Sequence, residues 1–179
     1  MQVDDNTLAR SAARGDRSAF ATLLERHYDR IYRLAWRWVG RRDVAEDVAQ
    51  EVCLKLATAI RSFRADATFS TWAYRIAYNA AIDHVRAQRR TEPTEAGEIE
   101  RLVDQAGAAR SPEAAVLDGE LWDAVRALPA QQRDAVLLVY GEDMSHAEAA
   151  ELMGCTEKTV SWHLHEARKR LKGALALAS

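Results

Sequence analysis

Apolar residues recur every three or four positions along most of this chain, and this spacing is typical of helices that bury one face. One apolar stripe predicts a helix from about Arg17 to Val39, and a second predicts a helix from Asp43 to Ile60. A third stripe begins at Phe69 and continues into the basic segment HVRAQRR, residues 84–90. No window alternates with the period of two expected of a half-buried strand. The sequence therefore predicts an all-α fold.

The second of these helices carries a start signal. Asp43 precedes the first apolar position of the stripe, and Glu46 follows three residues later. Residues at this spacing can form a capping box, in which each side chain accepts from the other residue's backbone N–H. We therefore expect Asp43 to open the helix and Glu46 to be its capping-box partner.

The helical periodicity stops between Thr91 and Arg110. Residues 91–120 hold eight acidic residues against Arg101 and Arg110, a net charge of −6, and prolines and glycines are frequent there. Such a composition buries too little apolar surface to offset the entropy lost on ordering. The sequence predicts a flexible acidic linker over 91–110, which joins two small helical domains, 1–90 and 111–179.

Helical periodicity resumes after the linker. Ser111 followed by Pro112 predicts an N-cap and a first helical residue, and a further helix is predicted after Pro129. Ser145 with Glu148 is another capping-box pattern. It predicts that a short helix starts at His146 and runs to Met153.

A glycine separates this short helix from the last one. Gly154 predicts a left-handed helix end, and Thr156 predicts the cap of the next helix, which together give the spacing of a helix-turn-helix. On a helical wheel the buried stripe of the last helix consists of Val160, Leu164, Ala167 and Leu171. The opposite face consists of Lys158, Trp162, His165, Glu166 and Lys169. A face that combines cations with a large aromatic residue is unusual for a merely solvated surface.

The two cysteines carry no disulfide or metal signature. Cys53 and Cys155 are far apart in the sequence, and no CxxC pair occurs. His163 and His165 lie about 200° apart around their helix, so they cannot hold one ion together. We expect Cys155 to fill the angle between two helices as a small apolar residue, with a redox or metal role as the alternative. No metal and no cofactor is predicted.

The basic residues are concentrated in two blocks, although the net charge of the 179-residue chain is only −2. Residues 61–90 hold six arginines and two aspartates, net +4, and residues 156–179 hold five basic and two acidic residues, net +3. Two basic blocks on either side of an acidic segment suggest two contacts with a polyanion. No apolar run approaches the roughly 20 residues of a membrane helix, and the amino terminus lacks the apolar part of a secretory signal. We therefore expect a cytoplasmic protein without membrane insertion.

Two long segments resemble one bacterial family. AEDVAQEVCLKLATAIRSFRADATFSTWAYRIAYNAAIDHVRAQRR, residues 45–90, resembles the second domain of the extracytoplasmic-function sigma factors of bacterial RNA polymerase. LPAQQRDAVLLVYGEDMSHAEAAELMGCTEKTVSWHLHEARKRL, residues 128–171, resembles their fourth domain. The resemblance implies a non-enzymatic factor that binds RNA polymerase core subunits and directs transcription from specific promoters. It implies that the factor binds promoter DNA both as a duplex and after melting. It also implies an anti-sigma partner.

The resemblance assigns roles within the first domain, 1–90. DVAQE, residues 47–51, matches the surface that binds the largest polymerase subunit, which implies that Asp47, Gln50 and Glu51 bind core polymerase. FRADATFSTW, residues 63–72, matches the loop that receives a base flipped out of the minus-ten element. Such a pocket needs an apolar or stacking wall and groups that hydrogen-bond the base edge, for which the candidates are Phe63, Asp66, Thr68 and Asn79. Phosphate contacts are implied for Arg75, Arg86, Arg89 and Arg90. Phe69 and Trp72 belong to the same matched segment. The alternative is that they are ordinary core residues, which for Trp72 is the favoured interpretation.

In the second domain, 111–179, the resemblance implies recognition of the minus-thirty-five element by the last helix. The base-reading positions correspond to Trp162, His165 and Glu166, and the phosphate contacts to Lys158, Arg168, Lys169 and Arg170. The sequence departs here from the family's arginine-rich and lysine-rich pattern. A glutamate such as Glu166 accepts from a cytosine amino group, whereas an arginine favours guanine.

Two other classes of function are weighed against this one. A free-standing helix-turn-helix regulator would use the amino-terminal half for dimerisation or sensing. An enzyme has little support, because the sequence has no glycine-rich phosphate loop and no paired carboxylates in a recognisable motif. His27 and His84 are single histidines on helices, which we interpret as packing or surface residues.

Overall fold

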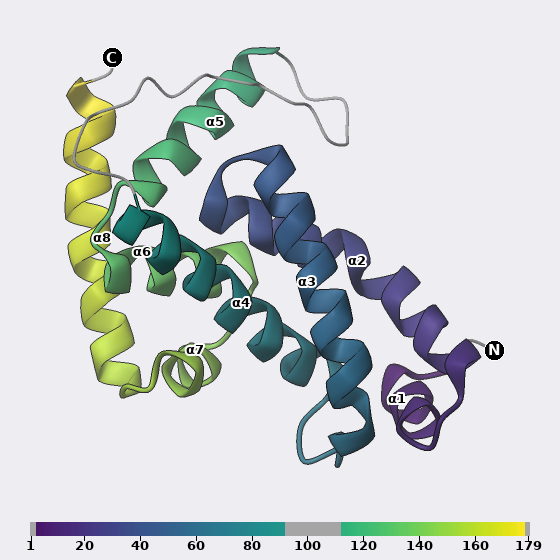
Figure 1. The fold of residues 1–179 in the computed structure, drawn as a ribbon. Helices are drawn as coiled ribbons and strands as arrows, with labels where there is room; N and C mark the ends of the chain where they lie inside the picture. Colours follow the sequence, from purple (N-terminus) through teal and green to yellow (C-terminus); the bar gives the residue numbers. More distant parts are fainter. Residues whose placement is uncertain (1–2, 92–111, 178–179) are drawn as a thin grey trace. The chain divides into compact units, whose positions relative to one another are not determined.

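A computed structural model of the chain describes residues 3–91 and 112–177, and every regular element within these ranges is a helix (Figure 1). This confirms the all-α fold class. The chain divides into two units, Met1–Ala96 and Gly97–Ser179, and each is described by itself below. The linker predicted for 91–110 lies outside the described residues apart from Thr91. The domain boundaries 1–90 and 111–179 therefore stay predictions.

The described residues of the first unit form four α-helices. They are α1 (Asp5–Ala13), α2 (Arg17–Val39), α3 (Arg42–Ala59) and α4 (Phe69–Thr91), with a 3₁₀ turn, Ile60–Ser62, after α3. Helices α2, α3 and α4 pack against one another, and α1 packs on α2, on α4 and on the 3₁₀ turn (Figure 1). The core contains large side chains that are almost completely buried: Leu23, Ile31, Leu34, Val48, Val52, Leu56, Phe69 and Tyr74. All of them except Tyr74 belong to the three apolar stripes predicted from the sequence, and Tyr74 was not predicted.

The ends of α2 follow from its flanking residues. The Asp16 side chain accepts hydrogen bonds from the backbone N–H groups of Ser18 and Ala19, both at 3.0 Å. Gly40 ends the helix with a φ of 71°, a left-handed conformation that glycine adopts without steric cost. The predicted range of this helix, from about Arg17 to Val39, is confirmed.

The predicted start of α3 is wrong. The helix begins at Arg42, one residue earlier than predicted, and Arg41 is an N-cap without a side-chain hydrogen bond. Asp43 consequently lies inside the first turn, where its carboxylate accepts from Arg41 Nη2 at 2.7 Å, and Glu46 accepts from Arg42 Nε at 3.3 Å. The hydrogen bond from Arg41 lowers the pKa of Asp43. Two exposed ion pairs therefore replace the predicted capping box.

Helix α1 was not predicted, because its apolar stripe is short and consists of small residues. Ala9 and Ala12 are its buried side chains, and both are less than 5% exposed. Alanines at a helix contact allow a close approach but give only a weak periodic signal in the sequence.

The second unit contains α5 (Pro112–Arg126), α6 (Ala130–Val136), α7 (His146–Met153) and α8 (Glu157–Leu177). The predicted start of α5 at proline is confirmed, whereas the N-cap prediction for Ser111 lies outside the described residues. The helix predicted after Pro129 is present as α6, and it widens at its end into a π-helical turn, Leu137–Gly141. This turn was not predicted.

The helix-turn-helix prediction is confirmed by α7 and α8. Ser145 N donates to Glu148 Oε2 at 2.9 Å, and Glu148 N donates to Ser145 Oγ at 3.2 Å, which completes the predicted capping box. Gly154 ends α7 with a φ of 66°. Thr156 then caps α8, because its Oγ1 accepts from Thr159 N at 3.2 Å.

Candidate nucleic-acid interface

Helix α8 has one buried and one exposed face. Val160, Leu164 and Ala167 are at most 2% exposed, and Leu171 is partly exposed near the end of the stripe. The residues on the opposite face are Lys158, Trp162, His165 and Lys169, all exposed, and Glu166, partly exposed. Trp162 is 56% exposed, which is unusual for so large an aromatic side chain. The predicted wheel is therefore confirmed, and it leaves this face available to a partner of α8.

Glu166 is held as a carboxylate on this face. Lys169 Nζ donates to Glu166 Oε1 at 3.0 Å, and this hydrogen bond lowers the pKa of Glu166. A charged acceptor beside a cation suits an exposed amino group of a base, which only donates. Lys169 competes for the same oxygens, so its side chain sets how available they are.

His163, next to Trp162, belongs to the packed side of the unit. Their ring centroids are 5.0 Å apart in an edge-to-face arrangement. Burial lowers the pKa of His163, although the carboxylate of Asp134 acts in the opposite direction. Its Nδ1 is buried and has no hydrogen-bond partner among the described residues. His163 is therefore partly buried and packs edge-on against Trp162, whereas His165 is exposed.

Two contacts beside the exposed face of α8 were not predicted. Arg168 Nη2 donates to the hydroxyl of Tyr140, and the guanidinium lies 5.7 Å from the centre of that ring. Tyr140 belongs to the π-helical turn and is 50% exposed. Near the start of α8, His146 Nδ1 lies 3.0 Å from Ser161 Oγ. Both contacts join residues well separated in the sequence, so helical periodicity gave no signal for them.

In the first unit, the loop between the 3₁₀ turn and α4 is exposed between two buried aromatic residues. Residues 64–68 are all exposed, and Ala65 has a φ of 60°, which is uncommon for a residue other than glycine. Phe63 is only 8% exposed, and its ring packs edge-on against Trp72, with centroids 5.3 Å apart. Phe63 therefore lies beneath the loop rather than on its surface, and Trp72 is partly buried.

Thr68 caps α4. Its Oγ1 accepts from Thr71 N at 3.2 Å and lies 3.0 Å from Thr71 Oγ1. Asp66 is exposed in the loop. Of the residues expected to contact the flipped base, Asp66 and Thr68 lie on one short exposed segment, and Thr68 also has a structural role.

The exposed face of α4 is basic. At 100° per residue, its side chains fall within about 60° of Arg75 around the helix axis. They are Asn79, Arg86, Arg89 and Arg90, and all five residues are exposed. Arg86, Arg89 and Arg90 lie together at the carboxyl end of the helix, and Arg75 lies about 16.5 Å before Arg86 at 1.5 Å per residue. A cluster of three arginines with a fourth further back is suited to phosphate contacts.

The residues predicted to bind core polymerase form one exposed face of α3. Asp47, Gln50 and Glu51 are all exposed, and Glu51 pairs with Lys55 at 2.7 Å. Leu54 is 71% exposed and lies on the same face, within about 20° of Asp47 around the axis. The sequence reading missed Leu54, because a single leucine outside the apolar stripe carries no periodic signal.

The described residues contain no group of three or more histidine, cysteine or acidic side chains that is able to hold a metal ion. Cys53 and Cys155 are both free and partly buried, and burial raises the pKa of the Cys53 thiol. Cys155 lies in the turn, with its N–H donating to Ala150 O at 3.0 Å. Among the helices of the described ranges, none is long and apolar enough to span a bilayer.

Comparison with known proteins finds matches for both units. Residues 23–91 match Sigma-70 region 2, and residues 118–171 match Sigma-70, region 4. The ECF RNA polymerase sigma-E factor of Haemophilus influenzae is 33% identical, over 97% of this chain and 96% of its own. The ECF RNA polymerase sigma factor SigW of Bacillus subtilis is 32% identical, over 90% of this chain and 91% of its own. The solved structure of CnrH in complex with the cytosolic domain of CnrY is 26% identical and has a TM-score of 0.74, covering 98% of this chain and 99% of that chain.

Proposed function

We propose a role for each exposed face on the premise that the chain belongs to the extracytoplasmic-function sigma factors of bacterial RNA polymerase. It binds core polymerase and directs initiation at specific promoters, and its family consists of regulatory DNA-binding proteins rather than enzymes. The observation that carries this function is the presence of regions 2 and 4 in one chain, with full-length relatives of the same kind.

The exposed face of α3 binds the largest polymerase subunit. Asp47, Gln50 and Glu51 supply charge and hydrogen-bond acceptors, and Leu54 supplies apolar surface between them. Protein interfaces gain most of their affinity from a few side chains that become buried on binding, with polar groups around them. The high exposure of Leu54 among three polar residues fits such an anchor.

The loop 64–68 and the basic face of α4 contact the minus-ten element. Asp66 and Thr68 hydrogen-bond a base that has left the stack, and Phe63 would become a wall for that base only after the loop above it moves, because Phe63 is buried. Asn79 also contacts the bases. Arg75, Arg86, Arg89 and Arg90 contact phosphates, which gives affinity without sequence information.

The exposed face of α8 reads the minus-thirty-five element in the major groove. Trp162, His165 and Glu166 face the bases, and the phosphate contacts come from Lys158, Arg168, Lys169 and Arg170. The Tyr140 hydroxyl fixes the direction of Arg168 on one flank of the helix. Recognition helices of this motif lie in the major groove and contact base edges with residues of their amino-terminal part.

The protein acts in the cytoplasm, where core polymerase is assembled on DNA, with residues 91–110 as the tether between domains 1–90 and 111–179. An anti-sigma protein restrains it. This partner is an expectation of the family, and the solved structure of CnrH is itself a complex with a second protein.

Reconstitution with purified core polymerase tests this function. Core polymerase with the chain is expected to give transcripts that depend on promoter sequence, and a randomised promoter library identifies that sequence. A chain that shifts DNA by itself and leaves core polymerase inactive would instead be a free-standing regulator.

The assignment of α3 is tested with a charge-reversal pair. Asp47→Arg combined with Gln50→Ala is expected to weaken co-purification with core polymerase. Glu25→Arg reverses an exposed acid on α2 and is the matched control. Equal retention of both variants by core polymerase would remove the assignment of α3.

A further inference from the structure

We propose that α1 is a positioning element for the loop 64–68, and that Asn6 is the residue through which it acts. The inference rests on the proposed role of that loop in receiving a base of the minus-ten element. It assigns a function to a helix that lies outside both matched regions, 23–91 and 118–171.

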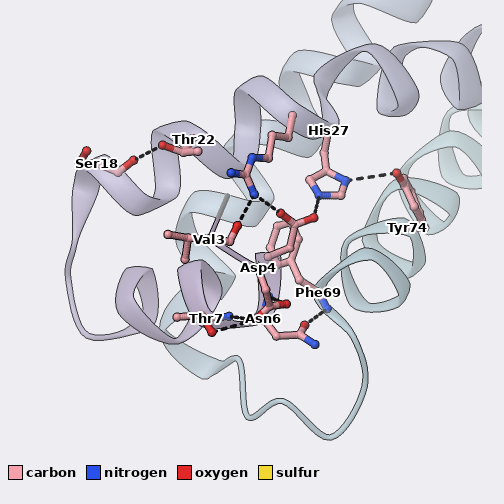
Figure 2. A network of polar contacts seen from close by, with 11 residues as sticks. Val3, Asp4, Asn6, Thr7, Ser18, Thr22, His27, Phe69 and Tyr74 are labelled. Carbon is pink, nitrogen blue, oxygen red and sulfur yellow. Dashed lines mark hydrogen bonds and ion pairs between the residues drawn. The ribbon is translucent and has the colours of Figure 1, made fainter. Parts of the chain in front are cut away.

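Asn6 holds the first residue of α4. Its side-chain Oδ1 accepts a hydrogen bond of 2.7 Å from Phe69 N, across 63 positions of sequence (Figure 2). Phe69 directly follows Thr68, whose side chain caps the same helix end. The loop is therefore fixed at its carboxyl end by two acceptors, one of its own and one from α1. Of these two acceptors, that of Asn6 belongs to a separate element.

A second contact ties α1 to the aromatic side chains beneath the loop. His27 Nε2 donates to Asp5 Oδ2 at 2.7 Å, and His27 Nδ1 lies 3.3 Å from the Tyr74 hydroxyl (Figure 2). The His27 ring also meets the Phe69 ring edge-on, with centroids 5.2 Å apart. Since Phe69 also packs against Phe63, Asp5 is linked through His27 to the two buried aromatic residues that flank the loop.

Asp5 is itself fixed. Arg26 Nη1 donates to Asp5 Oδ1 and to Val3 O, each at 2.7 Å. Partial burial raises the pKa of Asp5, but the hydrogen bonds from Arg26 and His27 outweigh it and lower the pKa below its usual value. Asp5 is therefore a carboxylate that accepts from two residues of α2 and keeps α1 in place.

Helix α1 is built to hold its position. Asp4 caps it and accepts from the backbone N–H groups of Asn6 and Thr7, both at 3.0 Å (Figure 2). Ala9 and Ala12 are buried against the unit. The acceptor of Asn6 therefore comes from a capped and packed helix, whereas the loop 64–68 is exposed throughout.

Fixing the loop matters because a flipped base is held by a few hydrogen bonds and by stacking, after the loss of its neighbours in the duplex. A loop that is already in place loses less conformational entropy when the base enters. Removal of the Asn6 acceptor leaves the Phe69 N–H without that partner and lets the loop move. The effect falls on DNA opening and on base preference, and not on the distant surface of α3.

The test compares three variants of the full-length chain in holoenzyme with purified core polymerase. A promoter is selected from a randomised library with the unaltered chain, and the fluorescence of 2-aminopurine at the flipped position reports opening. Asn6→Ala removes the acceptor, and Asn6→Asp keeps an acceptor at the same place. Thr7→Ala removes only the side-chain hydrogen bond from Thr7 Oγ1 to Asp4, and it keeps the two backbone hydrogen bonds by which Asp4 caps α1.

For Asn6→Ala we expect the rate of opening, and the preference between the best and worst base at the flipped position, each to fall about fivefold to tenfold. Core affinity stays within about twofold. Asn6→Asp recovers most of the loss, and Thr7→Ala behaves like the unaltered chain.

The proposal is overturned if Asn6→Ala opens the promoter and selects bases like the unaltered chain, or if Asn6→Asp is as defective as Asn6→Ala. It is also overturned if Thr7→Ala gives the same loss, or if Asn6→Ala loses core affinity in parallel, because α1 would then contribute only stability. Failure of the unaltered chain to give promoter-dependent transcripts refutes the proposed function itself, which is a different result.

Discussion

Replacement of Leu54 by alanine is expected to weaken binding to core polymerase without affecting folding. The side chain is 71% exposed, so its removal leaves no cavity and the free energy of unfolding changes by less than about 0.5 kcal/mol. Complete burial of a leucine side chain contributes about 1.5–3 kcal/mol. The part of Leu54 that is exposed, and is therefore available for burial on binding, contributes about 1–2 kcal/mol. Its loss corresponds to a rise in the dissociation constant of roughly fivefold to thirtyfold.

The assay is a titration of core polymerase with labelled chain, together with a thermal melt of each variant. Leu54→Met keeps the apolar surface and is expected to bind within about twofold of the unaltered chain. Val3→Ala removes an exposed apolar side chain from another part of the unit and is the matched control. Unchanged affinity of Leu54→Ala would show that the face of α3 is not the docking surface, or that Leu54 remains exposed in the complex.

Three further predictions concern the second unit. Glu166→Arg is expected to move the preferred minus-thirty-five bases from cytosine towards guanine at one position, with unchanged core affinity, as measured with a randomised promoter library. Tyr140→Phe removes the hydroxyl that accepts from Arg168, and it is expected to weaken promoter binding severalfold without changing how that binding depends on salt. Arg168→Ala removes a phosphate contact, so the slope of log affinity against log salt concentration should fall in magnitude by about one. The hydrogen bonds from Ser145 lower the pKa of Glu148, so the capping box stabilises the fold above the ordinary glutamate pKa of about 4.3. In thermal melts the unaltered chain should exceed Glu148→Gln in stability at pH 7, and this difference should be lost as the pH falls below that value and through the lower pKa of the folded state.

Most of the fold could be predicted because its helices are long and have apolar residues on one face. The range of α2 and the buried stripe of α8 followed from residue spacing alone. The turn between α7 and α8 was predictable for a different reason. Gly154 and the pair of Ser145 and Glu148 have side-chain properties that determine local backbone geometry whatever the rest of the chain does.

The features that were missed depend on contacts between distant parts of the chain. Helix α1 has too few large apolar residues for a periodic signal, and it is held in place through Asp5 and Asn6, whose partners are more than twenty positions away. The capping box predicted for α3 failed because the helix begins at Arg42, which places Asp43 inside the first turn and not at the N-cap. Residue spacing alone does not fix the first residue of a helix to within one or two positions.

On the proposed function, the distribution of charge predicts weak promoter binding in the absence of polymerase. The net charge of −2 gives the whole chain no long-range attraction to DNA, and each basic face offers only a few cations. Phosphate contacts of that number are weak at physiological salt when they act alone. The proposed docking to core polymerase through α3 would raise the local concentration of both faces at the promoter, as linked binding sites do. Variants on α3 should therefore lower promoter occupancy without changing base preference, whereas variants on the exposed face of α8 should change base preference at constant core affinity.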